Sequence, residues 1–121
     1  MENLIDYSNL KVKRDVHWAD LTEQYLRHLS FEIDSITKLI EDENFNSLQK
    51  KANSMKYSAC TYQLKEIAQC IEKLEIQAKN QSTEDVLIAV DELIRAITGE
   101  IQQLNKEIRE QLEDSFTEEF N

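Results

Sequence analysis

The sequence has almost none of the residues that build tight turns. Its 121 residues include one Gly and no Pro, so the frequent sharp turns of a β-sandwich or β-barrel have little to form them. Two cysteines, Cys60 and Cys70, are too few for a disulfide framework, and a reduced, cytoplasmic setting is therefore expected. A chain of this length allows one domain.

Long apolar runs and an excess of basic residues are missing as well. Without a run of about 18 apolar residues, no membrane span is expected, and the first residues do not resemble a secretory signal. The formal net charge of -10 makes nucleic acid a poor candidate partner, because phosphate neutralisation supplies much of that affinity. One stretch, 44–65, is instead positively charged, with four lysines and no acid. Such a charge run is also typical of an ordinary solvated helix face.

What the sequence does have is helical periodicity. Apolar residues recur every three or four positions in four segments, about 15–42, 45–62, 64–78 and 83–114. A connection is expected near 61–63, and Ser82 is expected to cap the last helix. The predicted fold is all-α: an antiparallel four-helix bundle at 15–114, with a short N-terminal arm or helix at 1–14 and an acidic tail at 115–121.

The last predicted helix carries a seven-residue repeat typical of a coiled-coil or bundle seam. The predicted inward positions are Leu87, Val90, Ile94, Ile97, Ile101, Leu104 and Ile108. At 1.5 Å per residue this helix would be about 48 Å long, twice the length of the two helices before it. We expect the excess to pack on the long first helix, and self-association through it is the alternative.

Residue patterns that carry catalytic or metal chemistry are absent. The sequence has no His-Glu-x-x-His, Glu-x-x-His or Cys-x-x-C pattern, so no metal site is predicted. A single Gly does not make a phosphate-binding loop. His17 and His28 are expected at the surface or boundary of the first helix, and the cysteines are expected to act as small hydrophobes. No cofactor is predicted, and no enzyme that does chemistry alone.

Residues 52–75, which read ANSMKYSACTYQLKEIAQCIEKLE, carry a family resemblance. They resemble the histidine-containing phosphotransfer domain, whose signature is approximately A-H-x-[LMI]-K-G-[SA]-[SA]-x-x-x-G followed by an apolar helix ending near L-E. The resemblance extends over about 18–104. The matching positions are Ala52, Met55, Lys56, Ser58, Ala59, Ile67, Ala68, Leu74 and Glu75.

The sequence departs from the family at three positions of the motif. Asn53 stands where the family has its phosphoacceptor histidine, Tyr57 where it has Gly, and Gln63 where a Gly is common. A carboxamide nitrogen is not a nucleophile, because its lone pair is delocalised into the carbonyl, so Asn53 is not expected to hold phosphate. The resemblance implies that Lys56 faces a phosphoryl group, and Lys50 and Lys51 would add to its field.

The resemblance implies a signalling function. The first hypothesis is a bundle that has lost its histidine and binds a response-regulator receiver domain, or a histidine kinase, through Lys50, Asn53, Lys56 and Tyr57 without passing phosphate. The second is a working phosphotransferase in which Asn53 is an engineered change. The third is an adaptor bundle that forms a homodimer through the C-terminal helix. A free-standing protein is expected rather than a piece of a larger sensor.

Overall fold

The computed structural model describes the backbone of residues 16–120 and the side chains of 18–113. It contains four helices, α1 (Val16–Glu41), α2 (Phe45–Thr61), α3 (Lys65–Lys79) and α4 (Thr83–Phe120), and no strand within the described residues. The prediction of an all-α protein is confirmed. The predicted arm at 1–14 lies outside the described residues.

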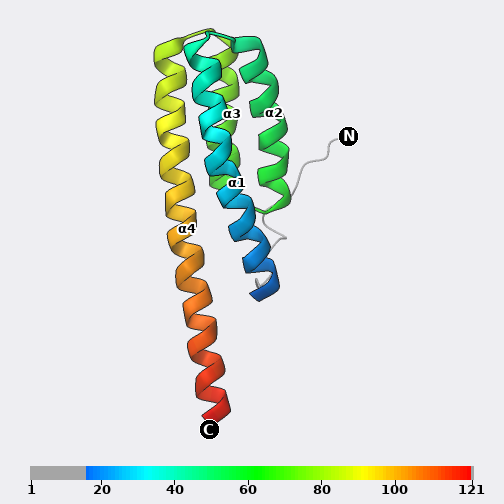
Figure 1. Cartoon of the computed structure of the whole chain (residues 1–121), viewed down its shortest axis with the longest axis vertical. Coiled ribbons are helices and arrows are strands. Elements are labelled where there is room, and N and C mark those ends of the chain that lie inside the picture. Colours follow the sequence, from blue (N-terminus) through cyan, green and yellow to red (C-terminus); the bar gives the residue numbers. More distant parts are fainter. Residues whose placement is uncertain (1–15, 121) are drawn as a thin grey trace.

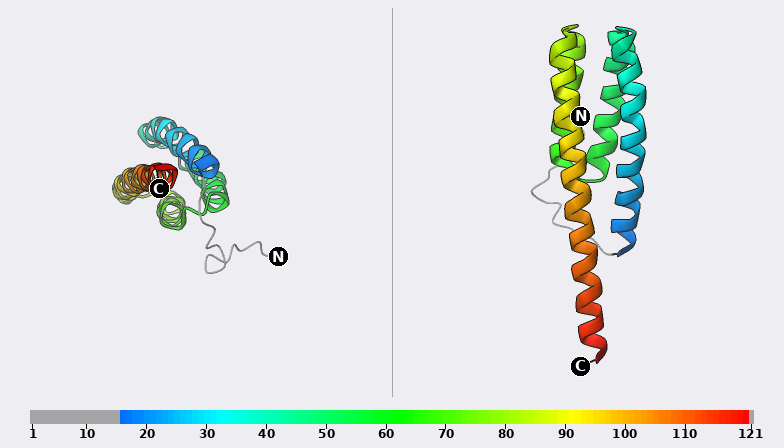
Figure 2. Two further views of the ribbon diagram at one scale, coloured as in Figure 1. Left: turned by 90° about the horizontal axis from the view of Figure 1, so that it is seen from below. Right: turned by 60° about the vertical axis from the view of Figure 1, so that its left-hand side comes forward.

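The four helices lie side by side, and each runs opposite to the one before it (Figure 1). An end-on view places them in a ring, with α1 beside α2 and α4, and α3 beside α2 and α4 (Figure 2). The C-terminal end of α4 projects beyond the other three helices in both figures. Each described helix therefore has two neighbours and one outer face.

The inner faces of α2 and α3 are the ones that the apolar spacing predicts. The buried positions of these two helices recur every three or four residues, which puts them on one face of each helix. The buried residues are Leu48, Ala52, Met55 and Ala59 on α2, and Ile67, Ala68, Ile71, Leu74 and Ala78 on α3. Leu64, at the start of α3, is buried with them. The outer faces of α2 and α3 are therefore left free for polar residues.

The three turns share one unusual backbone feature. Each contains a residue other than Gly with a positive φ: Glu43 at 54°, Gln63 at 61° and Gln81 at 55°. At Gln63 the backbone N–H donates to Cys60 O at 2.9 Å, and the next N–H, of Leu64, donates to Ala59 O at 3.0 Å. This paired pattern closes the end of a helix and favours Gly at the left-handed position. The missing glycines explain why sequence alone places these turns only loosely.

The start of α4 follows the sequence prediction. Ser82 Oγ accepts a hydrogen bond from the backbone N–H of Asp85 at 3.3 Å and donates one to Asp85 Oδ2 at 2.9 Å. The first bond is the N-cap bond expected of a Ser at this position, and the second joins the capping hydroxyl to the carboxylate three residues later. The prediction that Ser82 caps this helix is confirmed.

The buried face of α4 differs from the predicted seam in its first half. Leu87 and Ile94, predicted to face inward, are 51% and 42% exposed. Val86, Ala89 and Leu93 are buried instead. The reason is that α4 packs between α1 and α3. Its buried face is the one directed between these two helices, and in the first half of α4 that face is not the one that carries the seven-residue repeat. The predicted positions Val90, Ile97 and Leu104 are buried.

The second half of α4 keeps the predicted seam as far as Ile108, and the helix is longer than α1. Ile108 is half-buried against the core, whereas Leu112 is 51% exposed. With 38 residues against 26 in α1, α4 is longer by about 18 Å at 1.5 Å per residue. Residues 115–120, predicted as a separate tail, continue the helix.

Candidate functional site

The four residues singled out by the resemblance all lie on the side of α2 that the core does not use. Asn53, Lys50 and Tyr57 are exposed, and Lys56 is half-buried. We call these four residues the α2 face. Because the buried residues of α2 are spaced by three or four, the positions between them are directed outward. None of these four side chains is therefore needed for packing in the core.

A glutamate of α3 binds two residues of the α2 face at once. Asn53 Nδ2 donates a hydrogen bond to Glu75 Oε2 at 2.9 Å, and Lys56 Nζ donates one to Glu75 Oε1 at 2.9 Å. The lysine contact is also a salt bridge in which both side chains are about one-fifth exposed, at 21% and 18%. We call Asn53, Lys56 and Glu75 the clamp.

The clamp changes the acidity of both charged members. Burial raises the pKa of the Glu75 carboxyl, but the hydrogen bonds from Lys56 and Asn53 outweigh that effect, and the pKa is lowered from its ordinary value. The hydrogen bond to Glu75 raises the pKa of Lys56. Both groups are consequently charged at neutral pH, and each neutralises the other. Lys56 is thus already provided with a counter-ion.

Tyr57 contacts the same lysine. Lys56 Nζ lies over the Tyr57 ring, 5.4 Å from the ring centroid, an arrangement that attracts a cation to the π face. The ring itself is 57% exposed. Lys56 therefore interacts with both a carboxylate and an aromatic ring, and much of the ring surface is open to solvent.

Lys50 lies one turn before Asn53 and borders an open cavity. The cavity has a volume of about 400 Å³ and lies between α2 and α3. Its lining residues are Asn46, Gln49, Lys50, Asn53 and Glu75. No carboxylate in the described part of the chain forms a salt bridge with Lys50, so it is the one lysine of the α2 face without a counter-ion there.

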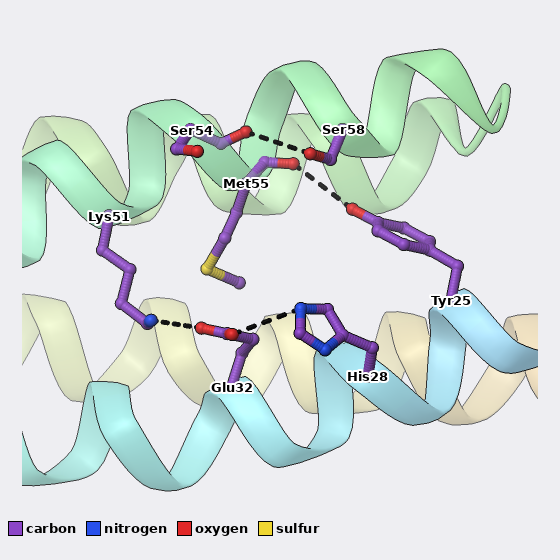
Figure 3. Close-up of polar contacts among 7 residues, drawn as sticks. All are labelled: Tyr25, His28, Glu32, Lys51, Ser54, Met55 and Ser58. Atoms are coloured by element: carbon purple, nitrogen blue, oxygen red, sulfur yellow. Dashed lines mark hydrogen bonds and ion pairs between the residues drawn. The ribbon is translucent and has the colours of Figure 1, made fainter.

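Lys51, expected to add to the same field, points to the opposite side of α2. It forms a salt bridge with Glu32 of α1, and His28 Nε2 lies 3.2 Å from the other oxygen of that carboxylate (Figure 3). Figure 3 also shows Tyr25 Oη donating to Met55 O, at 3.4 Å. This polar cleft ties α1 to α2. The expected contribution of Lys51 to the Asn53 site is therefore wrong, because its charge is used between α1 and α2.

The aromatic and sulfur groups outside the α2 face serve packing. Tyr25 stacks on Tyr62 with ring centroids 4.3 Å apart, and burial raises the pKa of its hydroxyl. Cys60 and Cys70 are half-buried and form no disulfide, and burial raises the pKa of Cys70. Cys70 lines a cavity of about 680 Å³ between α3 and α4, away from the α2 face. A raised thiol pKa opposes reactivity.

Glu75 is the residue of the clamp that sequence reasoning did not select. The resemblance matched it only as the end of an apolar helix. The turn predicted near 61–63 was the signal that could have identified Glu75. In two antiparallel helices joined by a turn, residues about equally far from the turn lie opposite each other, as Asn53 and Glu75 do.

His, Cys, Asp and Glu side chains form no metal-holding group within the described residues. No described helix is long and apolar enough to cross a membrane.

Comparison with known proteins adds no neighbour. No protein-family model, no curated protein and no solved structure matches the chain.

Proposed function

We propose that the chain is a signalling protein of the phosphotransfer type that binds response-regulator receiver domains through the α2 face and does not itself carry phosphate. The observation that carries the proposal is the clustering of Asn53, Lys56 and Tyr57 on one outer helix face. These are the positions that the resemblance assigns to the acceptor histidine, to its lysine, and to a glycine whose missing side chain lets a receiver domain approach the histidine closely. In this reading the four helices form the antiparallel bundle of that family.

The backbone at Gln63 supports the same alignment. The resemblance places a family Gly at this position, and Gln63 adopts the left-handed conformation, with a φ of 61°, that favours Gly. The support is independent of the α2 face, because it comes from a turn on which no binding argument depends. If the family motif were aligned one residue earlier or later, its Gly would no longer fall on the left-handed residue Gln63.

The chemistry of Asn53 decides between binding and phosphate transfer. In transfer from a phosphorylated receiver, the aspartyl P–O bond breaks, a P–N bond forms to an imidazole nitrogen, and the aspartate leaves as a carboxylate. The carboxamide of Asn53 lacks a free lone pair on nitrogen, and its N–H is donated to Glu75. The chain therefore acts as a competitor or regulator of a phosphorelay in this proposal.

Binding to a panel of receiver domains, measured by calorimetry, tests the proposal. Lys56→Met and Tyr57→Ala are expected to weaken binding by about tenfold or more, because both remove contact area or complementary charge at the centre of the face. Lys73→Met and Phe31→Ala are the matched controls, since Lys73 is a salt-bridged lysine on α3 and Phe31 is 74% exposed on α1. The proposal fails if no receiver binds, or if the face variants bind like the controls.

A phosphotransfer assay with Asn53→His addresses the second hypothesis in the same experiment. The native chain is expected to take up no phosphate. Uptake by Asn53→His would show that the docking geometry is retained and that only the acceptor is missing. Uptake by the native chain would overturn the assignment of Asn53 as the silent acceptor position.

A second candidate, an adaptor that forms a homodimer through α4, has one observation in its favour. Leu112, toward the C-terminal end of α4, is 51% exposed, and Leu87 and Ile94 are exposed nearer the start of the helix. Sedimentation of the native chain and of Leu112→Lys at several concentrations tests it. A monomeric mass for the native chain removes this candidate, and a dimer that Leu112→Lys abolishes supports it.

A further inference from the structure

The clamp has the geometry of an occupied oxyanion site. Two N–H donors on α2, from Asn53 and Lys56, converge on the two oxygens of one carboxylate, each at 2.9 Å. Short, charge-assisted bonds from a lysine and an amide are a usual way for proteins to hold a carboxylate or phosphoryl group. Here the bound anion is Glu75, which belongs to the chain itself.

The space for a second anion lies next to the clamp. The open cavity of about 400 Å³ is bordered by Glu75 and Asn53, and by Lys50 and two further carboxamides, Asn46 and Gln49. Carboxamide NH₂ groups donate hydrogen bonds, as lysine does. Lys50 has no salt-bridge partner in the described residues, so the cavity wall opposite Glu75 has a cation that is still available.

The charged side chains that border the cavity are one lysine, Lys50, and one glutamate, Glu75, although the chain as a whole has a formal net charge of -10. Glu75 is in turn paired with Lys56. Displacing Glu75 would leave Lys56 unpaired beside Lys50. An oxyanion that takes the place of Glu75 therefore meets two lysine charges.

We propose that the cavity between α2 and α3 is an oxyanion-binding site that Glu75 holds closed. An incoming carboxylate or phosphoryl group binds Lys50 and the carboxamides, and displaces Glu75 from Lys56 and Asn53. The proposal deepens the proposed function and rests on it for the source of the anion, which would be the acidic pocket of a receiver domain. Free phosphate shares the same chemistry, and the experiment separates the two sources.

The test is a titration with inorganic phosphate at constant ionic strength, followed by amide NMR. Native chain and Glu75→Gln are compared, because Gln is isosteric and removes only the competing charge. Glu75→Gln is expected to bind phosphate about tenfold more tightly than the native chain, with shifts confined to Asn46–Tyr57 and to the residues next to position 75 on α3. Adding Lys50→Met to Glu75→Gln is expected to abolish the gain.

Two further variants keep the result unambiguous. Glu92→Gln is the matched control, since Glu92 pairs with Lys73 between α3 and α4 and its loss changes net charge equally. If Glu75→Gln does not fold, Glu75→Asp retains the charge with a side chain too short to hold both donors, and is expected to show a smaller gain. Equal gains in Glu92→Gln, or no gain in either Glu75 variant, would overturn the site.

Receiver binding by the same variants separates this inference from the proposed function. Glu75→Gln is expected to bind a receiver several-fold more tightly than the native chain. If receivers bind the native chain but Glu75→Gln gains neither phosphate nor receiver affinity, the oxyanion site is wrong and the proposed function stands. If phosphate binding rises and no receiver binds any variant, the site stands and the proposed function is wrong.

Discussion

Asn53 and Glu75 lie 22 residues apart in the sequence and are joined by a hydrogen bond of 2.9 Å between Nδ2 and Oε2. Lys56, 19 residues from Glu75, reaches the other oxygen. Both contacts cross from α2 to α3, so the outward-facing residues of α2 also hold two helices together. Changes at the candidate site are therefore expected to affect stability as well as binding.

Glu75→Gln is expected to lower the free energy of unfolding by about 1 kcal/mol at neutral pH. The change removes one charge-assisted hydrogen bond and leaves Lys56 with reduced compensation, and partly exposed pairs of this kind contribute about that much. Urea unfolding of the native chain, Glu75→Gln, Lys56→Met and the double variant measures the effect. If the two single losses simply add in the double variant, the two side chains are not coupled and the clamp has no energetic role.

The stability of the clamp is expected to depend on pH in a defined direction. The pKa of Glu75 is lowered in the folded state, so its contribution is present above its ordinary value of 4.5 and is lost as pH falls through the lowered pKa. The pKa of Lys56 is raised above 10.5, so the pair persists past that pH and is lost only at higher pH. The native chain should exceed Glu75→Gln in stability at pH 7, and the difference should vanish in acid. A difference that is constant with pH would contradict the lowered pKa.

The sequence was sufficient to predict α2 and α3, because both have a single apolar stripe that only one helix face accommodates. It was not sufficient to find Glu75. Which glutamate of α3 meets Lys56 depends on the length and shape of the turn at Tyr62–Leu64, and that turn has neither Gly nor Pro to mark it. The left-handed backbone at Gln63 is visible only in the folded chain.

Gln63→Gly is expected to stabilise the protein by about 0.5–1 kcal/mol. A residue with a Cβ in the left-handed region costs roughly 1–2 kcal/mol, and the greater freedom of Gly in the unfolded chain offsets part of the gain. Gln69→Gly, at an exposed position inside α3, is the matched control and should destabilise by about 1 kcal/mol. Thermal unfolding by circular dichroism distinguishes them. If both substitutions destabilise, Gln63 is not strained and the family alignment loses its second support.

The buried face of α4 was harder to predict for a different reason. Apolar residues occupy adjacent positions there, at Val86 and Leu87 and again at Leu93 and Ile94. Two stripes one residue apart satisfy helical periodicity equally well, and only the positions of α1 and α3 on either side select one of them. A seven-residue repeat describes the spacing of a stripe but does not identify which neighbouring helix it faces.

Core truncations in α4 test which stripe is buried. Leu93→Ala should lower the free energy of unfolding by about 2–5 kcal/mol, because Leu93 is fully buried and its loss leaves a cavity. Leu87→Ala makes the same chemical change six residues earlier in the sequence, at a side chain that is 51% exposed, and should cost about 0.5 kcal/mol or less. Urea unfolding of both variants at one pH gives the comparison directly. A larger loss for Leu87→Ala would mean that the seven-residue seam is the buried face in solution, and that α4 is rotated relative to α1 and α3.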